Sequence, residues 1–416
     1  MTSQTLIALA LLLPLAGAVL IGLVGRWPNL RETVTLVTAV ALMSSVWSLL
    51  PEVYAGGRPS LLVGEMMPGF TIAFEVEPLG MLFAALASLL WIINSVYSIG
   101  YMRGNQERHQ TRFYACFAIA LAATMGIAFA GNLLTLFLCY EILTVSTYPL
   151  VAHKGDRATV RSARVYLGIL MGTSIGLLLP AILWTYATTG TLDFEPGGIL
   201  EGKLAGPAVG LMLALYVFGI AKSAIMPVHR WLPAAMVAPT PVSALLHAVA
   251  VVKAGVFSVT KVITYVFGID FLAGQPSAEW LTPLACFTIL GASAVALAQT
   301  NLKRMLAYST ISQLSYIVMA AAVLKPLSEI GAAIHMVSHA FGKITLFFAA
   351  GAIYVASKKT ELHQLHGIGR RMPWTMAAFT IGALSMIGVP PTAGFVSKWY
   401  ILGGSLQQGN LLAVFT

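Results

Sequence analysis

Long runs of apolar residues, separated by short polar stretches, make up almost the whole chain. Each run is near or above the length of about 20 residues that a helix needs to cross the hydrocarbon core of a bilayer. A helix satisfies its own backbone hydrogen bonds there, so helices are the expected form. We therefore expect an all-α integral membrane protein, with 1–416 as a single membrane domain. The pattern predicts twelve spans, at residues 6–25, 34–50, 79–101, 113–130, 133–152, 165–187, 207–226, 241–267, 281–298, 305–324, 330–356 and 374–401.

Composition agrees with a membrane protein, since 58% of the residues are hydrophobic and only 9% are charged. No soluble domain is predicted in the longest polar stretches, which are 51–78, 188–206 and 357–373. The last of these is rich in His, Gly and basic residues, and we expect it on the cytoplasmic surface. The first run, Leu6–Gly25, has no basic residue before it and is expected to be a retained helix, not a cleaved signal peptide.

The net charge of +9 could suggest a nucleic-acid partner, but the distribution of the charges favours a membrane topology. The loops after odd-numbered spans hold 16 basic residues and 4 acids, whereas those after even-numbered spans hold 3 basic residues and 10 acids. Basic loops stay in the cytoplasm, so the alternation predicts a cell (inner) membrane protein with its N-terminus outside. Nucleic acid is not an expected partner. The 16 basic residues are Arg26, Arg31, Arg103, Arg108, Arg112, Lys154, Arg157, Arg161, Arg164, Arg230, Lys303, Arg304, Lys358, Lys359, Arg370 and Arg371.

Two spans carry prolines close to a lysine. Lys222 lies in "GIAKSAIMPVHRWLP" and Lys398 lies in "IGVPPTAGFVSKWY". Proline removes a backbone donor, and paired interrupted helices are typical of transporters built from internal repeats. We therefore predict N-terminal helices at 1–112 and two inverted repeats at 113–267 and 281–416, each with one broken helix. The alternative is that the prolines only kink packed helices.

Ionisable residues inside the apolar runs are the strongest functional signal, because each costs about 2.5–3.5 kcal/mol or more in a bilayer. Glu141 lies in "LFLCYEILTVSTYPL" and is expected to be protonated or paired with a cation; a structural salt bridge is the alternative. His247 and Lys253 are six residues apart and can line one polar cavity without touching. Lys261 lies near the end of the same span, where we expect it to snorkel to the surface.

His335, His339 and Lys343 follow an i, i+4, i+8 pattern on one face of the eleventh span. Two histidines at this spacing can bind a metal, but a lysine is the next group on the face and would repel it. A water-linked proton relay and structural hydrogen bonding are the remaining interpretations. Lysine and histidine suit proton transfer because their charge responds to burial and to neighbouring groups. Na⁺ would require oxygen ligands.

No metal or cofactor is expected. Cys116, Cys139 and Cys286 lie in apolar stretches without CxxC spacing, and we interpret them as core residues. The chain also lacks iron–sulfur spacing and a Gly-rich nucleotide loop, so it could not carry out redox chemistry itself.

At this point the chain resembles a known family. "PTPVSALLHAVAVVKAGVF", "NLKRMLAYSTISQLSYI", "HMVSHAFGKITLFF" and "GVPPTAGFVSKW" are similar to segments of the proton-conducting antiporter-like membrane subunits. These subunits occur in complex I, in Mrp-type cation/proton antiporters, and in related membrane hydrogenases and carbon-uptake systems. The resemblance covers residues 75–401.

The resemblance implies a proton path. Glu141 would pair with Lys222, Lys253 would be the central lysine with His247 beside it, and the span 11 group would continue the path to Lys398. A terminal lysine is similar to the D-type member of the Mrp antiporters and to the distal subunit of complex I, whose long lateral helix is absent here. The family usually has fourteen helices, so we expect either a fragment or closing helices supplied by another chain.

Three functions remain open. The first, which we favour, is a proton-translocating subunit of a multisubunit Na⁺/proton antiporter, similar to the D-type member of the Mrp antiporters, that works with other membrane subunits. The second is a proton-pumping subunit of a complex I-like NADH:quinone oxidoreductase or related redox complex, in which the enzyme activity resides elsewhere. The third is a scaffold with inert salt bridges in the membrane.

Overall fold

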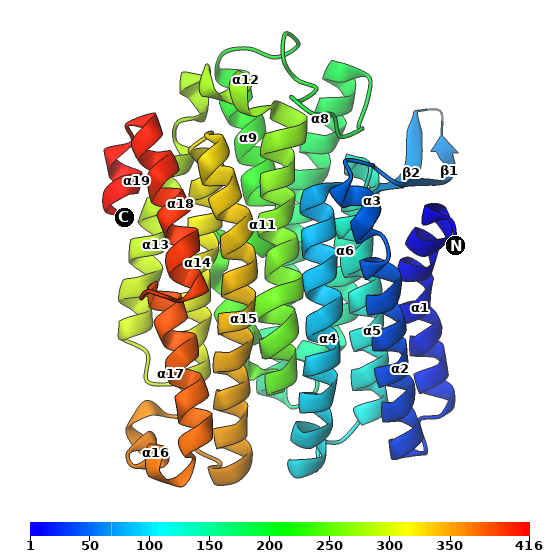
Figure 1. The fold of residues 1–416 in the computed structure, drawn as a ribbon, viewed down its shortest axis with the longest axis vertical. Helices are drawn as coiled ribbons and strands as arrows, with labels where there is room; N and C mark the ends of the chain where they lie inside the picture. The colour runs from blue at the N-terminus through cyan, green and yellow to red at the C-terminus, as the bar shows by residue number, and fades with distance from the viewer. Residues whose placement is uncertain (68) are drawn as a thin grey trace. The chain divides into compact units, whose positions relative to one another are not determined.

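The computed structural model describes residues 1–67 and 69–416, and it confirms a predominantly helical membrane fold (Figure 1). Among the described residues, ten helical stretches are long and apolar enough to cross a membrane. They correspond to ten of the twelve predicted spans. The other two predicted spans, 207–226 and 374–401, are the two interrupted helices, and both are broken beside the expected lysine.

The chain divides into two compact units. The first comprises Met1–Glu195 together with Val237–Pro239. A π-helical turn at Ser174–Leu178 joins its last two helices. Its elements are α1 (Ser3–Leu23), α2 (Pro28–Trp47), α3 (Leu50–Tyr54), β1 (Ser60–Met67), β2 (Phe70–Glu75), α4 (Pro78–Gly104), α5 (Gln110–Ala128), α6 (Leu133–Val151), α7 (Arg157–Thr173) and α8 (Leu179–Thr189).

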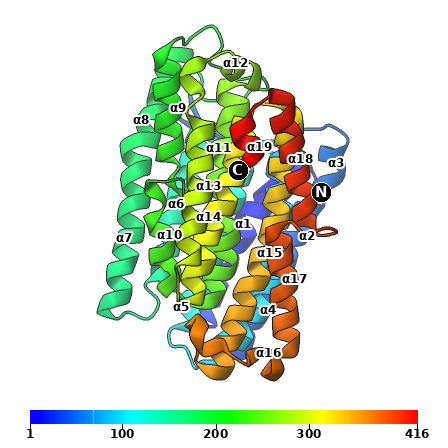
Figure 2. The same cartoon turned by 90° about the vertical axis from the view of Figure 1, so that its left-hand side faces the viewer.

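The second unit comprises Pro196–Met236 and Thr240–Thr416. Within it, α13 packs along α14, and α15 packs along α17 and α18 (Figure 2). Its helices are α9 (Pro207–Gly219), α10 (Trp231–Ala234), α11 (Val251–Val262), α12 (Ile269–Ala273), α13 (Leu281–Leu297), α14 (Leu302–Ala322), α15 (Pro326–Ser357), α16 (Ile368–Arg371), α17 (Pro373–Ile387), α18 (Ala393–Gln408) and α19 (Leu411–Phe415).

Helix starts follow ordinary end chemistry. The side chain of Asn132 accepts a hydrogen bond from the Thr135 amide and caps α6, and Asp156 does the same for α7. Proline supplies the first residue of α2, α4, α9, α15 and α17, where its missing N–H costs nothing. Local sequence therefore fixes where many of the membrane helices begin.

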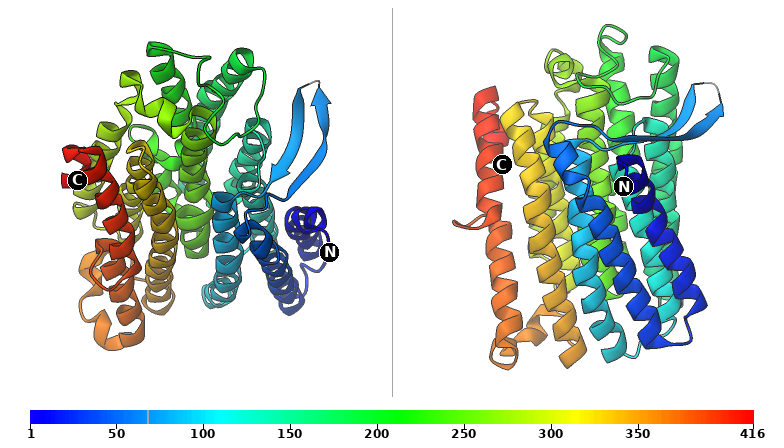
Figure 3. Two further views of the ribbon diagram at one scale, coloured as in Figure 1. Left: turned by 45° about the horizontal axis from the view of Figure 1, so that its top comes forward. Right: turned by 45° about the vertical axis from the view of Figure 1, so that its right-hand side comes forward.

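The polar stretch 51–78 contains a β-hairpin that the hydropathy pattern did not predict. Strands β1 and β2 are antiparallel, with Ser60 opposite Glu75 and Met67 opposite Phe70. The hairpin extends beyond the helices of the first unit (Figure 3). Its β2 edge is fixed to the α5–α6 connection, where Gly131 donates to the carbonyl of Ala73 at 2.9 Å.

Hydrogen bonds join the loops that carry the basic residues. In the first unit, Arg31 donates to Gln110 at 2.7 Å and Arg112 donates to the carbonyl of His153 at 2.9 Å. In the second, the amide of Leu302 donates to the carbonyl of Thr360 at 3.0 Å. Within each unit, loops after odd-numbered spans thus meet at one end, as an up-and-down helix order requires.

Candidate functional site

The buried basic residues of the second unit lie on α15, on α11 and the π-helical segment before it, and at the first helix break, and the partly buried Lys398 lies on α18. Helix α15 carries His335, His339 and Lys343, and all three side chains are fully buried. The helix is continuous over its 32 residues, so the predicted i, i+4, i+8 face is preserved. Its neighbours α11, α14 and α18 supply the groups that these three residues contact.

Lys253 and His339 form the central junction. Both are fully buried, and the ammonium nitrogen of Lys253 hydrogen-bonds to Nδ1 of His339. A lysine ammonium can only donate, so Nδ1 accepts and the neutral imidazole carries its proton on Nε2. That Nε2 has no hydrogen-bond partner among residues 1–67 and 69–416. The junction therefore offers a proton on each side of the imidazole ring.

His335 continues the chain of polar groups toward α18. Its Nδ1 lies 2.9 Å from Oγ of Ser397, and its ring centre lies 6.1 Å from that of His339. The hydroxyl of Ser338 lies 3.4 Å from the same Ser397 hydroxyl. The ring centre of Tyr316 on α14 is 5.9 Å from that of His335. The His335 ring thus lies close to the Ser397 hydroxyl and to the rings of His339 and Tyr316.

Lys398 is held by the second broken helix. Helix α17 ends at Ile387, and the Lys398 ammonium donates to the carbonyls of Met386 and Ile387 at 3.1 and 3.2 Å. These are the last carbonyls of a helix, which have no partner within it and lie at its negative end. The break therefore supplies the acceptors that an ammonium group in a membrane requires.

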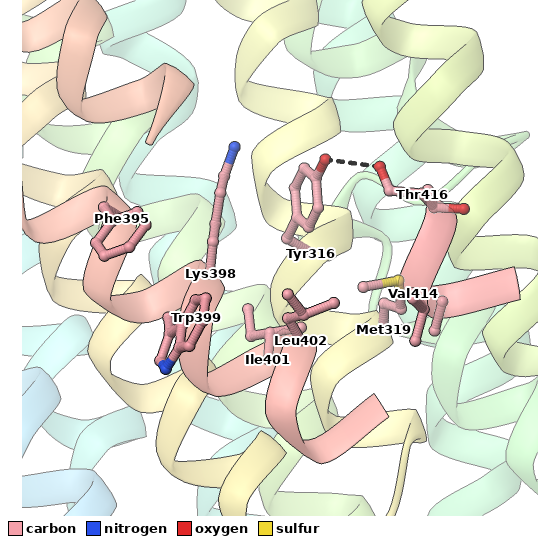
Figure 4. A pocket seen from close by; sticks show the side chains of 10 residues that line it. Tyr316, Met319, Phe395, Lys398, Trp399, Ile401, Leu402, Val414 and Thr416 are labelled. Atoms are coloured by element: carbon pink, nitrogen blue, oxygen red, sulfur yellow. Dashed lines mark hydrogen bonds between the residues drawn. The ribbon is translucent and has the colours of Figure 1, made fainter. Parts of the chain in front are cut away.

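A pocket of about 320 Å³ opens beside Lys398. Tyr316, Phe395 and Trp399 contribute its aromatic lining, and the Lys398 side chain extends along it past the Tyr316 ring (Figure 4). The ammonium nitrogen lies 4.8 Å from the centre of that ring. The aromatic face adds a favourable cation–π contact to the two carbonyl bonds.

Lys343 makes its contacts with α14. Its ammonium donates to Oγ of Ser309 at 2.7 Å and to the carbonyl of Leu306 at 3.3 Å. Its charge also acts on Lys253 and on His339. Lys343 is therefore a side branch next to the central junction, on the side away from Ser397.

Lys222 lies in the first broken helix. Helix α9 ends at Gly219, and Lys222 follows in a short 3₁₀ turn at Ala221–Ser223, with a fully buried side chain. This turn packs against Gly255 of α11, where an added Cβ would overlap the backbone of Lys222. Glycine at 255 therefore allows the broken helix to approach within two residues of Lys253.

His247 lies on a π-helical segment, Val242–Ala250, which runs directly into α11. Its ring is fully buried and lies 6.3 Å from the ring of Trp231, whose indole N–H donates to the carbonyl of Ala221 at 2.8 Å. Trp231 therefore connects His247 with the turn that holds Lys222.

The prediction for Lys261 was wrong. Its side chain is only 1% exposed and does not snorkel. The ammonium lies 5.5 Å from the ring centre of Phe257 and 6.0 Å from that of Tyr265. These residues are one turn away on either side along the same helix, so aromatic faces take the place of water. The available sequence signal was the spacing of Phe257 and Tyr265, each four residues from Lys261, and our prediction did not use it.

Glu141 belongs to the first unit, on α6. Tyr166 of α7 interacts electrostatically with it and hydrogen-bonds to Thr147. No hydrogen-bond partner of either carboxylate oxygen is found in the described part of the chain. Lys222 belongs to the other unit, so the Glu141–Lys222 pair stays a prediction.

Uncharged hydroxyl residues are the part of the site that sequence reasoning missed. Ser309, Tyr316, Ser338 and Ser397 each touch a predicted Lys or His. Ser309 and Tyr316 are seven residues apart on α14, which places them on one helix face. That spacing in an apolar span was the available signal.

The site has a single sign of charge. No ion pair in the described chain includes Lys253, Lys343 or Lys398. His335 experiences the charges of both Lys398 and Lys253. Like charges repel strongly in an apolar interior, so full protonation of all three lysines at once is opposed. Charge on one position favours loss of a proton from the next, which is a property of a proton relay.

Residues 130–416 match the family described as NADH:quinone oxidoreductase/Mrp antiporter, TM. The chain is 35% identical over 381 residues to NADH-quinone oxidoreductase subunit N of Desulforudis audaxviator, covering 90% of this chain and 75% of that protein. It is 32% identical over 364 residues to NAD(P)H-quinone oxidoreductase chain 5 of Synechocystis sp., covering 82% of this chain and 51% of that one.

Two solved structures share the fold. A chain of the Mrp complex from Dietzia sp. DQ12-45-1b has a TM-score of 0.89 at 24% identity, covering 100% of this chain and 77% of its own. A chain of the membrane-bound sulfane sulfur reductase, an archaeal respiratory membrane complex, has a TM-score of 0.86 at 26% identity, covering 98% and 83%. The chain thus belongs to the NADH:quinone oxidoreductase/Mrp antiporter family of antiporter-like membrane subunits.

Proposed function

We propose that this chain translocates protons through the buried groups of α11, α15 and α18 as one subunit of a multisubunit membrane complex. The observation that carries the proposal is the buried hydrogen bond between Lys253 and His339, neither of which takes part in an ion pair with an acid in the described chain. A neutral imidazole that accepts from an ammonium can take its proton and release another from the opposite nitrogen.

The proposed path starts at Glu141 and Lys222, passes His247 and Lys253, and continues through His339 and His335 to Lys398. Lys343 tunes the charge of the central junction from the α14 side. In this proposal the two predicted repeats, 113–267 and 281–416, each contribute one helix break, with Lys222 at the first and Lys398 at the second.

The test is proton flux in vesicles that contain the complex with its native partner subunits. Lys253→Ala and Lys222→Ala should each abolish flux, while blue-native gels show that the assembly is retained. Wild-type flux in both variants would refute the relay. Lys359→Ala, on the polar segment after α15, is the matched control and should transport like the wild type.

Two assemblies could drive this movement. Subunit N and chain 5 are named as parts of quinone oxidoreductases, and the similarity to them favours a redox-driven complex. A Na⁺/proton antiporter is the other candidate. A terminal lysine such as Lys398 is similar both to the D-type member of the Mrp antiporters and to the distal subunit of complex I, so it is compatible with either assembly. A quinone-site inhibitor would stop proton flux only in the redox-driven assembly, whereas a Na⁺ gradient would drive it only in the antiporter.

We also propose that the N-terminus faces outward in a bacterial cell membrane, with the basic loops inside. Cysteine introduced at Arg157 should react with a membrane-impermeant maleimide only after the cells are opened, whereas cysteine at Glu52 should react in intact cells. The reverse pattern would invert the topology.

A further inference from the structure

One histidine outside the buried chain of polar groups is not used by the proposed path. His229 lies in a short 3₁₀ turn, Val228–Arg230, that follows the first helix break. Its side chain is half-buried, and its Nδ1 is buried without a hydrogen-bond partner within the described ranges. Its ring centre lies 6.3 Å from that of Tyr308 on α14. A titratable ring with an unused nitrogen is thus placed at the edge of the second unit.

The turn passes from the surface to the core within a few residues. Arg230 is exposed, whereas Trp231 beside it is fully buried. Trp231 is also the residue that lies against His247, with 6.3 Å between the ring centres. His229 is therefore two residues away from a buried side chain that lies beside His247.

The position of His247 also points to this end of the unit. The charge of Lys303, at the start of α14, reaches His247. Lys303 belongs to the basic loop that is hydrogen-bonded to the segment around Thr360. His247 is thus within reach of the charge of a basic loop, and His229 lies two residues before Trp231, whose ring packs beside that of His247.

The chemistry of His229 fits a carrier of protons. Burial lowers the pKa of His229 below that of a free histidine; a hydrogen bond with the backbone of Pro227 opposes this shift, and the charge of Arg230 adds to it. The ring is therefore neutral at neutral pH, with one nitrogen able to accept a proton and the other able to donate one. Its partial exposure lets water reach it, which the fully buried His247 does not allow.

We infer that His229 exchanges protons between the water at the basic-loop surface and the proposed path, which it would join at His247. Water delivers a proton to one ring nitrogen, and the imidazolium releases the proton of the other nitrogen inward. Tyr308 packs beside the ring and is a positioning residue. The inference rests on the proposed proton translocation, because it supplies that path with a surface group.

The experiment is proton flux by the assembled complex in vesicles, for the wild type, His229→Gly and His229→Gln. Loss of a proton-transfer group typically slows a step by 10²–10⁴-fold, so we expect both variants to slow flux by at least about tenfold. Added imidazole should restore His229→Gly, whose cavity admits it, but not His229→Gln, whose side chain fills the space. His363→Gly, which removes an exposed histidine from the segment before α16, should leave flux unchanged.

Two outcomes overturn the inference. Wild-type flux in both His229 variants would show that protons enter elsewhere, and slowed flux that imidazole cannot restore would assign His229 a structural role. Lys253→Ala measured alongside separates the two proposals. If it abolishes flux while His229→Gly does not, only the surface group is wrong, whereas flux in Lys253→Ala refutes the translocation path itself.

Discussion

Buried charged residues occur in two regions of this molecule, and the two regions differ in whether those residues have partners of opposite charge. In the first unit, Glu32 lies between Arg31 and Arg103, with its Oε1 3.3 Å from Arg31 and 3.1 Å from Nε of Arg103. Arg31 also donates to Gln110 and lies 5.2 Å from the ring of Tyr114. In the second unit, lysines and histidines lie in a row without an acidic partner in any described ion pair.

This difference in partners distinguishes charges that stabilise the fold from charges that can take part in proton transfer. A buried charge with matched partners fixes the geometry of the helices that supply it, and losing one partner leaves the others exposed to the full cost of burial. A buried lysine with only neutral acceptors gains less from being charged, so it can release its proton. We therefore interpret the Arg31–Glu32–Arg103 cluster as structural and the Lys/His row as functional.

The largest expected effect is on the structural cluster. Glu32→Gln leaves the buried Arg31 without its anion, and breaking a buried ion pair in this way should lower the free energy of unfolding by about 3 kcal/mol. The Arg103 side chain is 46% exposed and adds little to this cost. Thermal unfolding of the purified complex would measure it. Glu75→Gln is the matched control, because its pair with Arg58 is more than a third exposed and worth about 0–1 kcal/mol. Equal effects of the two changes would remove the distinction between the regions.

The opposite result is expected for the functional row. Lys343→Met removes a buried charge while keeping the volume, so stability should stay the same or rise, as for other buried charges replaced by apolar groups. Flux should nevertheless fall, because the charge that Lys343 exerts on Lys253 and His339 is lost. Combined flux and unfolding measurements on one preparation test this. A large loss of stability would place Lys343 with the structural charges.

A smaller loss of stability is expected when the contact between the first broken helix and α11 is disturbed. Gly255→Ala introduces a methyl group against the backbone of Lys222 and should cost about 1–3 kcal/mol of stability. Gly168→Ala on α7, where a Cβ would meet nothing within 4 Å, should instead stabilise its helix by about 0.5–1 kcal/mol. If both variants unfold at the wild-type temperature, the helix break does not pack tightly against Gly255.

The smallest effect is expected at a hydroxyl partner. Ser397→Ala removes the group 2.9 Å from Nδ1 of His335, and a neutral hydrogen bond is worth about 0.5–1.5 kcal/mol. Flux should therefore fall about two- to tenfold. Ser405→Ala is the control on the same helix, because its hydroxyl donates to the carbonyl of Ile401 one turn earlier, and it should leave flux unchanged. Identical flux in the two variants would argue that Ser397 is not part of the relay.

Hydropathy and proline positions were sufficient to predict the spans, both helix breaks and the buried Lys and His residues. Each of these depends on the cost of placing a polar group or a broken backbone in an apolar medium, which is a local property of the sequence. The π-helical segment around His247 was not predictable in this way, because it depends on packing around Val242–Ala250 and not on composition. The partners Ser309 and Ser397 come from other helices, and serine is too common in membrane helices to stand out.

The β-hairpin escaped prediction for a related reason. Leu62, Val63, Met66 and Met67 do not alternate with polar residues, so period-two patterning is absent from β1. The hairpin is instead held from its β2 side, where Ala73 and Glu75 bond to the α5–α6 connection. Long-range backbone contacts of this kind leave no local signature.

The acceptors of Lys398 have a consequence for how the site tolerates mutation. Both are main-chain carbonyls, those of Met386 and Ile387, and every amino acid carries the same carbonyl. Side-chain changes at these two positions should leave the acceptors in place. The position of these carbonyls depends instead on the next residue, Gly388. Its backbone φ of 89° ends α17, and this conformation is costly for other residues. The site that binds the Lys398 ammonium is thus formed by the end of a helix, and a single glycine, Gly388, determines where that helix ends.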